Sequence, residues 1–183
     1  MPHHETSADD VVVRVLREPP GAGFDCGRDE QTRFLRERAW TDQQARLSVT
    51  YCYYVDEVLA AYAAVCMDAI SLGKKERESD VRYSQIGAVK LAQLGVSVPF
   101  QHRGVGQRLL ADMIALARKT AKEIGCRYVT LDSQPDLVAW YEFHGFRTNY
   151  LRQAERILDA LMHGREPERS AVSMRFDLRE AEA

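Results

Sequence analysis

The chain has 183 residues, of which 45% are hydrophobic and 28% are charged, and its formal net charge is −2. These values are typical of soluble globular proteins and exclude a disordered chain or a membrane-protein composition. The charge balance also excludes a bulk attraction to nucleic acid, although it leaves room for a local basic surface.

The N-terminal part is predicted to form a leader, a strand, a turn and a helix. Residues 1–10 are polar and lack the apolar core of a signal peptide, so we expect a flexible leader followed by a single domain over 11–183. The β-branched run at 11–17 predicts a strand, and the Pro-Pro-Gly turn at 18–23 ends it. Mixed charged and apolar residues at 28–47 predict one helix or two short ones.

Two apolar runs follow, at 48–55 and 58–70, and both are rich in β-branched or aromatic residues. An Asp-Glu pair is all that separates them, which favours a β-hairpin with a tight turn. The alanines of the second run would also suit a helix, but the run has no capping residues.

The central part contains a charged loop, a strand and a helix. We expect the charged residues at 73–82 to form a mobile loop. The mostly apolar run at 88–98 predicts a long strand that Pro99 terminates. Apolar residues then recur at i, i+3 and i+4, which predicts an amphipathic helix that ends at Gly125.

The C-terminal part alternates strands and helices. Strands are predicted at 127–131, 146–149 and 171–178, and helices at 137–144 and 151–162. Together with the preceding elements this order indicates an α/β (α+β) protein with a central mixed sheet flanked by helices.

The cysteines indicate free thiols rather than a metal site. Cys26, Cys52, Cys66 and Cys126 are widely scattered, and none is part of a metal-ligand spacing. No run approaches the roughly 20 apolar residues that a membrane span needs. We therefore expect a cytoplasmic protein with no bound metal.

The loop after the central strand has the pattern of an anion-binding site. Gly104 and Gly106 permit backbone conformations and close approaches that a Cβ would forbid. Since the loop leads directly into a helix, its N–H groups coincide with the positive end of the helix dipole. Arg103 and Arg108 add charge, so the loop suits a pyrophosphate; the alternative is a simple tight turn between strand and helix.

Two other phosphate-binding loops are excluded by spacing. A Walker A loop needs a Gly-Lys pair that is absent after either glycine. A dinucleotide fingerprint needs a third glycine, where this chain has Leu109.

Two motifs in sequence resemble the core of the GNAT superfamily of acetyl-CoA-dependent N-acetyltransferases. Q-x-x-G-x-G at 101–106 lies between a strand and an amphipathic helix, and W-Y-E-F-H-G-F follows at 140–146 after another strand. The similarity covers about residues 90–149. It implies the GNAT fold, with a mostly antiparallel twisted sheet, and direct transfer of an acetyl group from acetyl-CoA to a primary amine.

The resemblance also implies which residues hold coenzyme A. The amides of the loop would hold the pyrophosphate, and the preceding strand would pair with the pantetheine arm. The implied residues are Val96, Ser97, Val98, Gln101, His102, Arg103, Gly104, Val105, Gly106, Gln107, Arg108 and Ser133.

Tyr141 lies where the family usually has a tyrosine near the thioester sulfur. A phenol with a pKa near 10 is protonated at neutral pH and can supply a proton to the departing thiolate. The resemblance therefore implies a general acid, whereas the residue type alone suits core packing. It also implies that the backbone N–H of Val96 or Val98 polarises the acetyl carbonyl, and Gly95 would ease a close approach there.

Other chemically reactive residues have simpler interpretations. Asp68, Glu57 and His102 could each act as a general base by residue type, but each is better explained as a solvated or structural group. We expect His144 to cap the end of its helix. Cys126 has no base nearby in sequence, so we expect an inert thiol.

The acceptor is less well defined than the donor. F-D-C-G at 24–27, followed by a helix, resembles the N-terminal region of GNAT toxins from toxin-antitoxin pairs, which acetylate the α-amine of aminoacyl-tRNA. The alternative is a turn in which Phe24 packs as a hydrophobic staple. Two departures count against the toxin group, namely Gln93 in place of a frequent Arg and the net charge of −2.

Several acceptor and partner hypotheses therefore stay open. A basic rim for tRNA phosphates could be formed by Arg28, Arg33, Arg36, Arg38 and Arg46 with Lys74, Lys75, Arg77 and Arg82. The alternatives are a small-molecule, peptide or protein amine, or a non-catalytic acyl-CoA-binding module. The toxin resemblance implies an antitoxin partner, and the apolar face of the helix at 151–162 suggests a homodimer.

Overall fold

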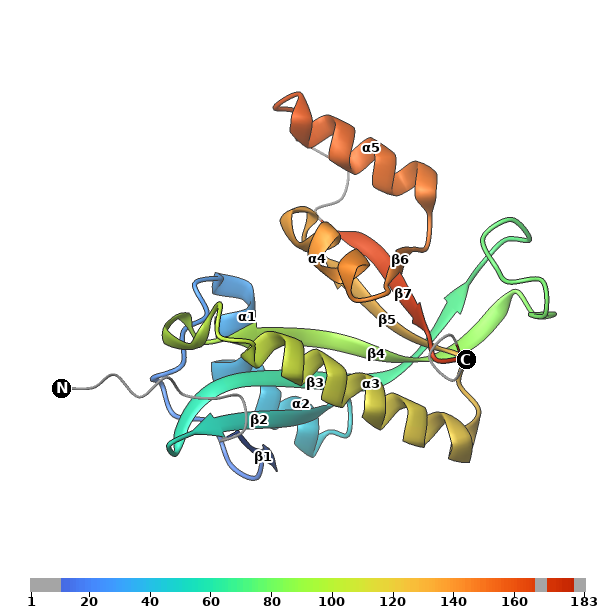
Figure 1. Cartoon of the computed structure of the whole chain (residues 1–183). Coiled ribbons are helices and arrows are strands. Elements are labelled where there is room, and N and C mark those ends of the chain that lie inside the picture. Colours follow the sequence, from blue (N-terminus) through green and yellow to red (C-terminus); the bar gives the residue numbers. More distant parts are fainter. Residues whose placement is uncertain (1–10, 167–170, 180–183) are drawn as a thin grey trace. The chain divides into compact units, whose positions relative to one another are not determined.

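The computed structural model describes residues 11–166 and 171–179 of the chain (Figure 1). Within these ranges, seven strands form one sheet in the order β1-β2-β3-β4-β5-β7-β6. Their bounds are β1 (Val12–Val15), β2 (Val49–Val55), β3 (Val58–Ser71), β4 (Gln85–Val96), β5 (Tyr128–Ser133), β6 (Arg147–Thr148) and β7 (Val172–Asp177). β4 pairs with β5 in parallel, and the other described pairs are antiparallel, so the predicted mixed sheet is confirmed. The leader predicted at 1–10 lies outside the described residues.

The helical segments differ in type. The α-helices are α1 (Asp29–Arg33), α2 (Ala39–Gln44), α3 (Val105–Ile124), α4 (Val138–Phe143) and α5 (Leu151–Met162). A π-helical turn, η2 (Phe34–Arg38), joins α1 to α2, while η3 (Val98–Phe100) and η4 (Pro135–Leu137) are 3₁₀-helical. Among the described residues, no helix is both long and apolar enough to cross a membrane.

The chain divides into two compact units. Unit 1 contains the chain up to Cys66 and the stretch Leu91–Leu116, and unit 2 contains Met67–Lys90 and the chain from Ala117 onward. β3, β4 and α3, which Figure 1 labels, each continue from one unit into the other. Each unit has a hydrophobic cluster of its own.

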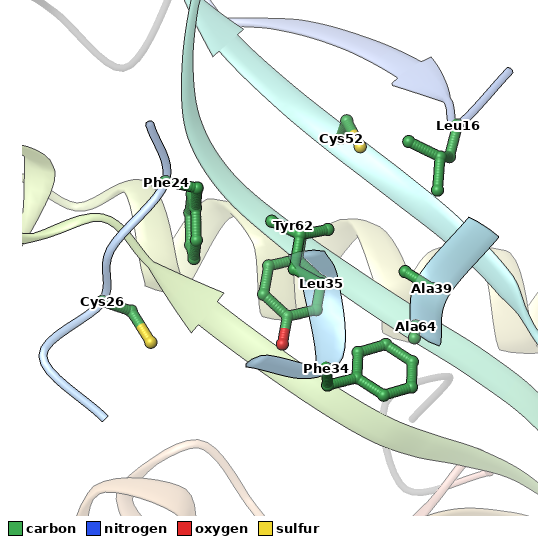
Figure 2. Packing of buried hydrophobic residues seen from close by; sticks show 9 residues of the cluster. All are labelled: Leu16, Phe24, Cys26, Phe34, Leu35, Ala39, Cys52, Tyr62 and Ala64. Carbon is green, nitrogen blue, oxygen red and sulfur yellow. The ribbon is translucent and has the colours of Figure 1, made fainter. Parts of the chain in front are cut away.

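Tyr62 is the largest side chain of the unit 1 cluster shown in Figure 2. It is fully buried, and its ring meets Phe24 edge to face at 5.4 Å between centroids and stacks on Phe34 at 6.1 Å. Its hydroxyl donates a hydrogen bond to the backbone oxygen of Gln31 at 2.7 Å. Burial raises the pKa of Tyr62, so the phenol stays protonated and keeps this bond.

The π-helical turn η2 joins α1 to a helix that contacts two other segments of unit 1. The backbone N–H of Ala39 donates to the oxygen of Phe34, five residues earlier, and both side chains are buried. Farther along, the Gln43 side chain donates to the oxygen of Leu16 and accepts from the N–H of Thr50 at 2.8 Å. Gln43 of α2 thereby bridges two segments of unit 1.

The tight turn between β2 and β3 confirms the predicted hairpin and shows that the helical alternative is wrong. Asp56 and Glu57 have φ values of 49° and 60°. Positive φ at both central residues is the geometry of a type I′ turn, which matches the twist of the flanking strands. The Glu57 carboxylate accepts hydrogen bonds from Arg14 at 2.9 and 2.7 Å, which lower the pKa of Glu57.

β4 is shifted from its predicted bounds. It runs from Gln85 to Val96, and Val98–Phe100 forms the 3₁₀ turn η3. Pro99 therefore does not end the strand. It occupies an early position of a helical turn, where its missing N–H and fixed φ fit.

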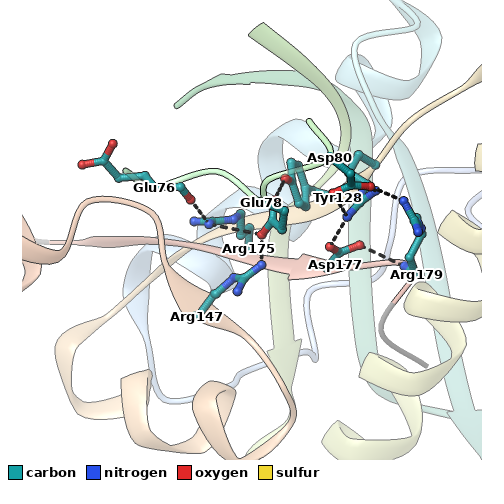
Figure 3. A network of polar contacts seen from close by, with 9 residues as sticks. Glu76, Glu78, Asp80, Tyr128, Arg147, Arg175, Asp177 and Arg179 are labelled. Carbon is teal, nitrogen blue, oxygen red and sulfur yellow. Dashed lines mark hydrogen bonds and ion pairs between the residues drawn. The ribbon is translucent and has the colours of Figure 1, made fainter. Parts of the chain in front are cut away.

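In unit 2, residues 72–84 connect β3 to β4 and are held by charged side chains (Figure 3). Glu78 accepts from Arg147 and from the Tyr128 hydroxyl, and it lies 3.5 Å from Arg175. Arg175 is 3% exposed and also donates to the backbone oxygen of Glu76. The charged loop predicted to be mobile is thus anchored.

A second ion-pair group fixes the far end of this loop. Arg127 donates to Asp80 at 3.1 Å and to Asp177 at 2.7 Å. Arg179 also bonds to Asp80, and its backbone N–H donates to Asp177 at 3.0 Å. The hydrogen bond from Arg127 lowers the pKa of Asp80 below its ordinary value.

Candidate functional site

The C-terminal half of β4 presents an edge for binding. The parallel register between β4 and β5 ends at Lys90 with Thr130, and β4 continues to Val96. Beyond the strand, the N–H of Ser97 donates to the oxygen of Ala60 in β3 at 2.8 Å. Because successive N–H groups of an extended chain point in opposite directions, the N–H of Val96 points away from β3.

The loop between η3 and α3 leads these strand residues into a helix N-terminus. His102 and Gly104 have φ values of 59° and 80°, both in the left-handed region. The oxygen of Gly104 accepts the first helical bond of α3, from Arg108 at 3.0 Å. The N–H groups of the first α3 residues therefore have no partner within the helix, and the helix dipole makes this end attractive to anions.

Gly106 brings this helix end against the end of β4. A Cβ built on Gly106 would lie 3.3 Å from Cγ2 of Val96, closer than most packed side-chain contacts. The glycine thus permits the first turn of α3 to pack on Val96. The strand end and the helix N-terminus are neighbouring parts of one site in unit 1.

Near the N-terminus of α3, Arg108 forms an ion pair with Asp112. Arg108 donates from Nε to both carboxylate oxygens of Asp112 at 3.1 Å, and Asp112 also accepts from the Tyr53 hydroxyl at 3.2 Å. Burial raises the pKa of Tyr53, so this hydroxyl remains a donor. Arg103 is exposed, as are the predicted coenzyme-binding residues His102 and Gln107.

The structure corrects the predicted role of Val98. Its N–H donates to the oxygen of Asp25 at 2.9 Å, so it is not available to an acetyl carbonyl. Ser97 is buried and its N–H is bonded to β3. Of the two backbone N–H groups predicted to donate to the acetyl carbonyl, the geometry therefore favours that of Val96.

The F-D-C-G turn at 24–27 lies in unit 1 beside this strand end. Its Asp25 side chain accepts from the N–H of Gly27 at 2.8 Å, and Cys26 N–H donates to the Thr32 hydroxyl at 3.2 Å. Gly27 has a φ of 73°, and a Cβ there would touch Val98 at 3.5 Å. The motif that resembles the GNAT toxins is thus a structured turn packed on Val98 of η3, just before the loop that leads into α3. Sequence could reveal the turn, but not that it meets residues more than seventy positions later.

The predicted site residues of unit 2 lie on and near α4. Tyr141 is buried, with its ring edge-on to Trp140 at 4.9 Å and to Phe146 at 5.6 Å between centroids. Ser133 is buried at the end of β5 and donates to the oxygen of Gln134 at 2.8 Å. Their roles toward coenzyme A remain predictions.

His144 has the contact expected of a helix cap. Its Nδ1 lies 2.7 Å from the oxygen of Trp140, one turn earlier. Because a carbonyl oxygen can only accept, Nδ1 must carry the proton of this bond. The imidazole therefore caps a carbonyl at the end of α4.

Two of the candidate bases, Asp68 and Glu57, are engaged by hydrogen bonds, and the candidate nucleophile Cys126 is unreactive. Asp68 accepts from the Thr130 hydroxyl at 2.6 Å and from the N–H of Ala69 at 2.8 Å. Glu57 is bound to Arg14, which makes it a weaker base. Burial raises the pKa of the Cys126 thiol, so little of it is thiolate at neutral pH. No group of three potential metal ligands occurs in the described part of the chain.

The basic residues proposed as a tRNA rim are divided between the units. Those at 28–46 lie in unit 1 and those at 74–82 in unit 2. Arg36 donates to the oxygen of Phe24 at 2.6 Å, and Arg38 lies 3.5 Å from Asp42. Some of this charge therefore has a structural role.

Comparisons with known proteins place the fold. A protein-family model described as "Acetyltransferase (GNAT) domain" matches residues 40–161. No curated protein matches the sequence.

Solved structures with the same fold include several bacterial toxins. One, described as a bacterial toxin, is 20% identical, with 92% of this chain and 91% of that chain covered and a TM-score of 0.75. AtaT complexed with acetyl-methionyl-tRNAfMet is 16% identical, with 94% and 98% covered and a TM-score of 0.76. A mutant AtaT bound to the C-terminus of the antitoxin AtaR and acetyl-CoA is 14% identical, with 93% and 95% covered and a TM-score of 0.70.

Proposed function

Since the chain belongs to the GNAT acetyltransferase family and is thus an acyltransferase, we propose that it transfers an acetyl group from acetyl-CoA directly to a primary amine. The observation that supports this most is the packing of the α3 N-terminus on the end of β4 through Gly106 and Val96. Free helix N–H groups suit a pyrophosphate. An open strand edge suits the amide groups of an extended pantetheine arm. We retain a single GNAT domain over 11–183 as part of this proposal.

In the proposed reaction, the amine nitrogen attacks the thioester carbon, a C–N bond forms and the C–S bond breaks. The N–H of Val96 stabilises the negative charge that develops on the carbonyl oxygen. Tyr141 gives its proton to the departing thiolate. An acceptor α-amine, with a pKa of about 7.7 to 8.0, is already partly deprotonated at neutral pH, so we assign no general base.

The acceptor we favour is the α-amine of an aminoacyl-tRNA. Two observations support it, namely the F-D-C-G motif at 24–27 and the presence of acetyl-methionyl-tRNA in the AtaT complex of the same fold. Exposed arginines such as Arg33 and Arg46 would contact phosphates. We further propose a cytoplasmic location and an antitoxin partner, by analogy with the AtaT–AtaR complex.

A small-molecule, peptide or protein amine is the second candidate acceptor. It is favoured by the net charge of −2 and by the structural use of Arg36 and Arg38, which leaves less free positive charge. A homodimer would suit either acceptor, and α5 exposes Leu161 and Met162 for such a contact.

Calorimetric titration with acetyl-CoA tests the donor, and labelled acetyl-CoA tests the acceptor. We expect acetyl-CoA to bind in the micromolar range. No binding at high micromolar concentration would contradict the proposed acetyl transfer, and with it both candidate acceptors. The acceptor screen should include charged tRNA, polyamines, aminoglycosides and peptides. Label on charged tRNA alone supports the favoured acceptor, and label on other amines alone supports the second candidate.

Tyr141→Phe tests the proposed general acid. Loss of the proton donor should lower kcat by about 10² to 10⁴-fold, the usual range for general acid-base catalysis, with little change in acetyl-CoA affinity. Steady-state kinetics and calorimetry measure the two effects separately. Tyr83→Phe, at a tyrosine that is 76% exposed, is the matched control. An unchanged kcat would remove Tyr141 from its role.

A further inference from the structure

The side chain of Gln101 joins the 24–27 turn to the last residue of β4. Its Nε2 lies 3.0 Å from the oxygen of Cys26 and 3.0 Å from the oxygen of Val96. A primary amide nitrogen has two hydrogens, so it can donate one to each carbonyl. Gln101 is only partly exposed, and these bonds engage the full donor capacity of its amide.

This contact fixes a peptide group of the candidate site from both sides. In the peptide between Val96 and Ser97, the oxygen accepts from Gln101 and the N–H donates to Ala60 at 2.8 Å. A trans peptide held at both ends cannot rotate without losing a hydrogen bond. The backbone direction at Val96 is therefore set by Gln101 on one side and by β3 on the other.

The direction of the Val96 N–H follows from this arrangement. In an extended strand, the N–H and the oxygen of one residue point to the same side. Because the oxygen of Val96 points toward the amide of Gln101, its N–H points to that side as well, away from β3. A shift of Gln101 would turn this N–H away from its present direction.

The 24–27 turn completes the connection. The oxygen of Asp25 accepts from the N–H of Val98 at 2.9 Å, next to the bond between Cys26 and Gln101. Two successive carbonyls of the turn are thus bound by residues that flank the 3₁₀ turn η3 or lie within it. The turn is in turn fixed to α1 through the hydroxyl of Thr32.

We propose that the Gln101 side chain is a positioning residue, which uses the 24–27 turn as a fixed support to orient the N–H of Val96. The proposal rests on the proposed function, in which the N–H of Val96 donates a hydrogen bond to the acetyl carbonyl. It gives the turn a role in orienting the N–H that binds the acetyl carbonyl, in addition to any part in the choice of acceptor. The Gln101 side chain acts on the protein backbone and makes no contact with the reacting atoms.

Three substitutions separate this role from a direct contact with coenzyme A. Gln101→Glu keeps the size of the side chain but places acceptor oxygens against two carbonyls, so neither bond can form with an ionised carboxylate. Gln101→Arg restores two N–H donors. Gln101→Ala removes the side chain without adding charge and serves if the Glu variant does not fold. Gln85→Glu, the same change at the exposed start of β4, is the control.

Kinetics give the first readout. Since misplacement of a catalytic group by about 1 Å can cost 10²-fold, we expect kcat to fall about tenfold or more in the Glu and Ala variants. The Kd for acetyl-CoA should change less than about threefold, well short of the tenfold change that corresponds to about 1.4 kcal/mol. The Arg variant should recover kcat. A Kd that rises as much as kcat falls would overturn the proposal, because it indicates direct coenzyme binding.

Amide hydrogen exchange gives a readout that needs no activity. The Val98 amide, protected by its bond to Asp25, should exchange faster in the Glu and Ala variants and normally in the Arg and Gln85→Glu proteins. Unchanged Val98 exchange in the Glu and Ala variants would overturn the support role of the turn. If the wild type fails to bind acetyl-CoA, the proposed function fails, while the exchange result still decides whether Gln101 holds the turn.

Discussion

The 24–27 turn of unit 1 and the 72–84 loop of unit 2 are both irregular segments, but different chemistry holds them in place. The bonds that join the turn to Gln101 and Val98 are neutral, although Arg36 and the Asp25 carboxylate also bind within the turn, beside the aromatic cluster around Tyr62. The loop is held by charges, above all Arg175 and Arg127. Neutral contacts respond little to salt or acid, whereas ion pairs respond to both.

The difference indicates which segment can open under mild changes of conditions. The 72–84 loop depends on carboxylates that lose their charge in acid and are screened by salt. The hydrogen bonds of the 24–27 turn with Gln101 and Val98 have no such dependence. Neutral bonds of this kind give better support to a site in which the direction of the Val96 N–H must stay fixed.

The largest expected effect is the loss of Arg175. Its guanidinium is buried and donates to the Asn149 side chain at 3.1 Å as well as to the loop. Arg175→Met leaves Glu78 and several carbonyl oxygens with fewer partners, so we expect a loss of about 3 to 5 kcal/mol in the free energy of unfolding.

Urea denaturation measures this change, and Arg179→Met is the control. Arg179 also pairs with Asp80, but its side chain is 67% exposed, so its loss should cost below about 1 kcal/mol. Equal losses for the two variants would contradict the division between buried and exposed charges.

A smaller effect is expected from Gly95→Ala in unit 1. A Cβ at Gly95 would lie 2.7 Å from Cε1 of Tyr62, and the ring is held by its hydroxyl and by Phe24. Overpacking of this kind costs about 1 to 3 kcal/mol. Gly23→Ala, where no atom lies within 4 Å, should leave the unfolding midpoint unchanged. Wild-type stability in Gly95→Ala would show that the aromatic cluster yields easily.

The smallest effect concerns acid and salt. The hydrogen bond from Arg127 lowers the pKa of Asp80 from its ordinary value of 3.8. Its stabilisation is therefore complete above 3.8 and disappears as pH falls through the lower folded pKa. After correction for intrinsic rates, exchange of the Val81 amide should quicken below pH 3.8 and at high salt, while that of the Val98 amide does not.

Asp80→Asn is the control for this last experiment. The amide cannot titrate, so the part of the acid response that comes from Asp80 should vanish. Equal acid sensitivity of Val81 and Val98 would mean that the two segments do not differ in the way proposed.

Local sequence patterns predicted most of the sheet. The hairpin of β2 and β3 followed from two apolar runs joined by Asp56 and Glu57, because such a short connection leaves few other geometries. The extent of β4 was less predictable. Val98 suits a strand by residue type, but a distant oxygen, that of Asp25, captures its N–H and favours the 3₁₀ turn.

The loop at 101–106 was also recognisable, since glycines directly before a helix are typical of an anion-binding helix N-terminus. The role of the Gln101 side chain was not recognisable, because its partners at Cys26 and Val96 depend on tertiary structure. The charged segment at 73–82 is predicted to be mobile for the same reason. Its charges are visible in sequence, whereas the buried Arg175 that receives them is nearly a hundred residues away.

The π-helical turn between α1 and α2 has a consequence for helix phase. Its bond from the N–H of Ala39 to the oxygen of Phe34 spans one residue more than the i to i−4 bond of an α-helix. Deleting one residue within 34–38 would therefore let this turn become α-helical, and Gln43 would keep its direction toward Leu16 and Thr50. A relative with a one-residue gap here keeps the same bridge, and an alignment that slides the gap elsewhere would pair residues from different helix faces.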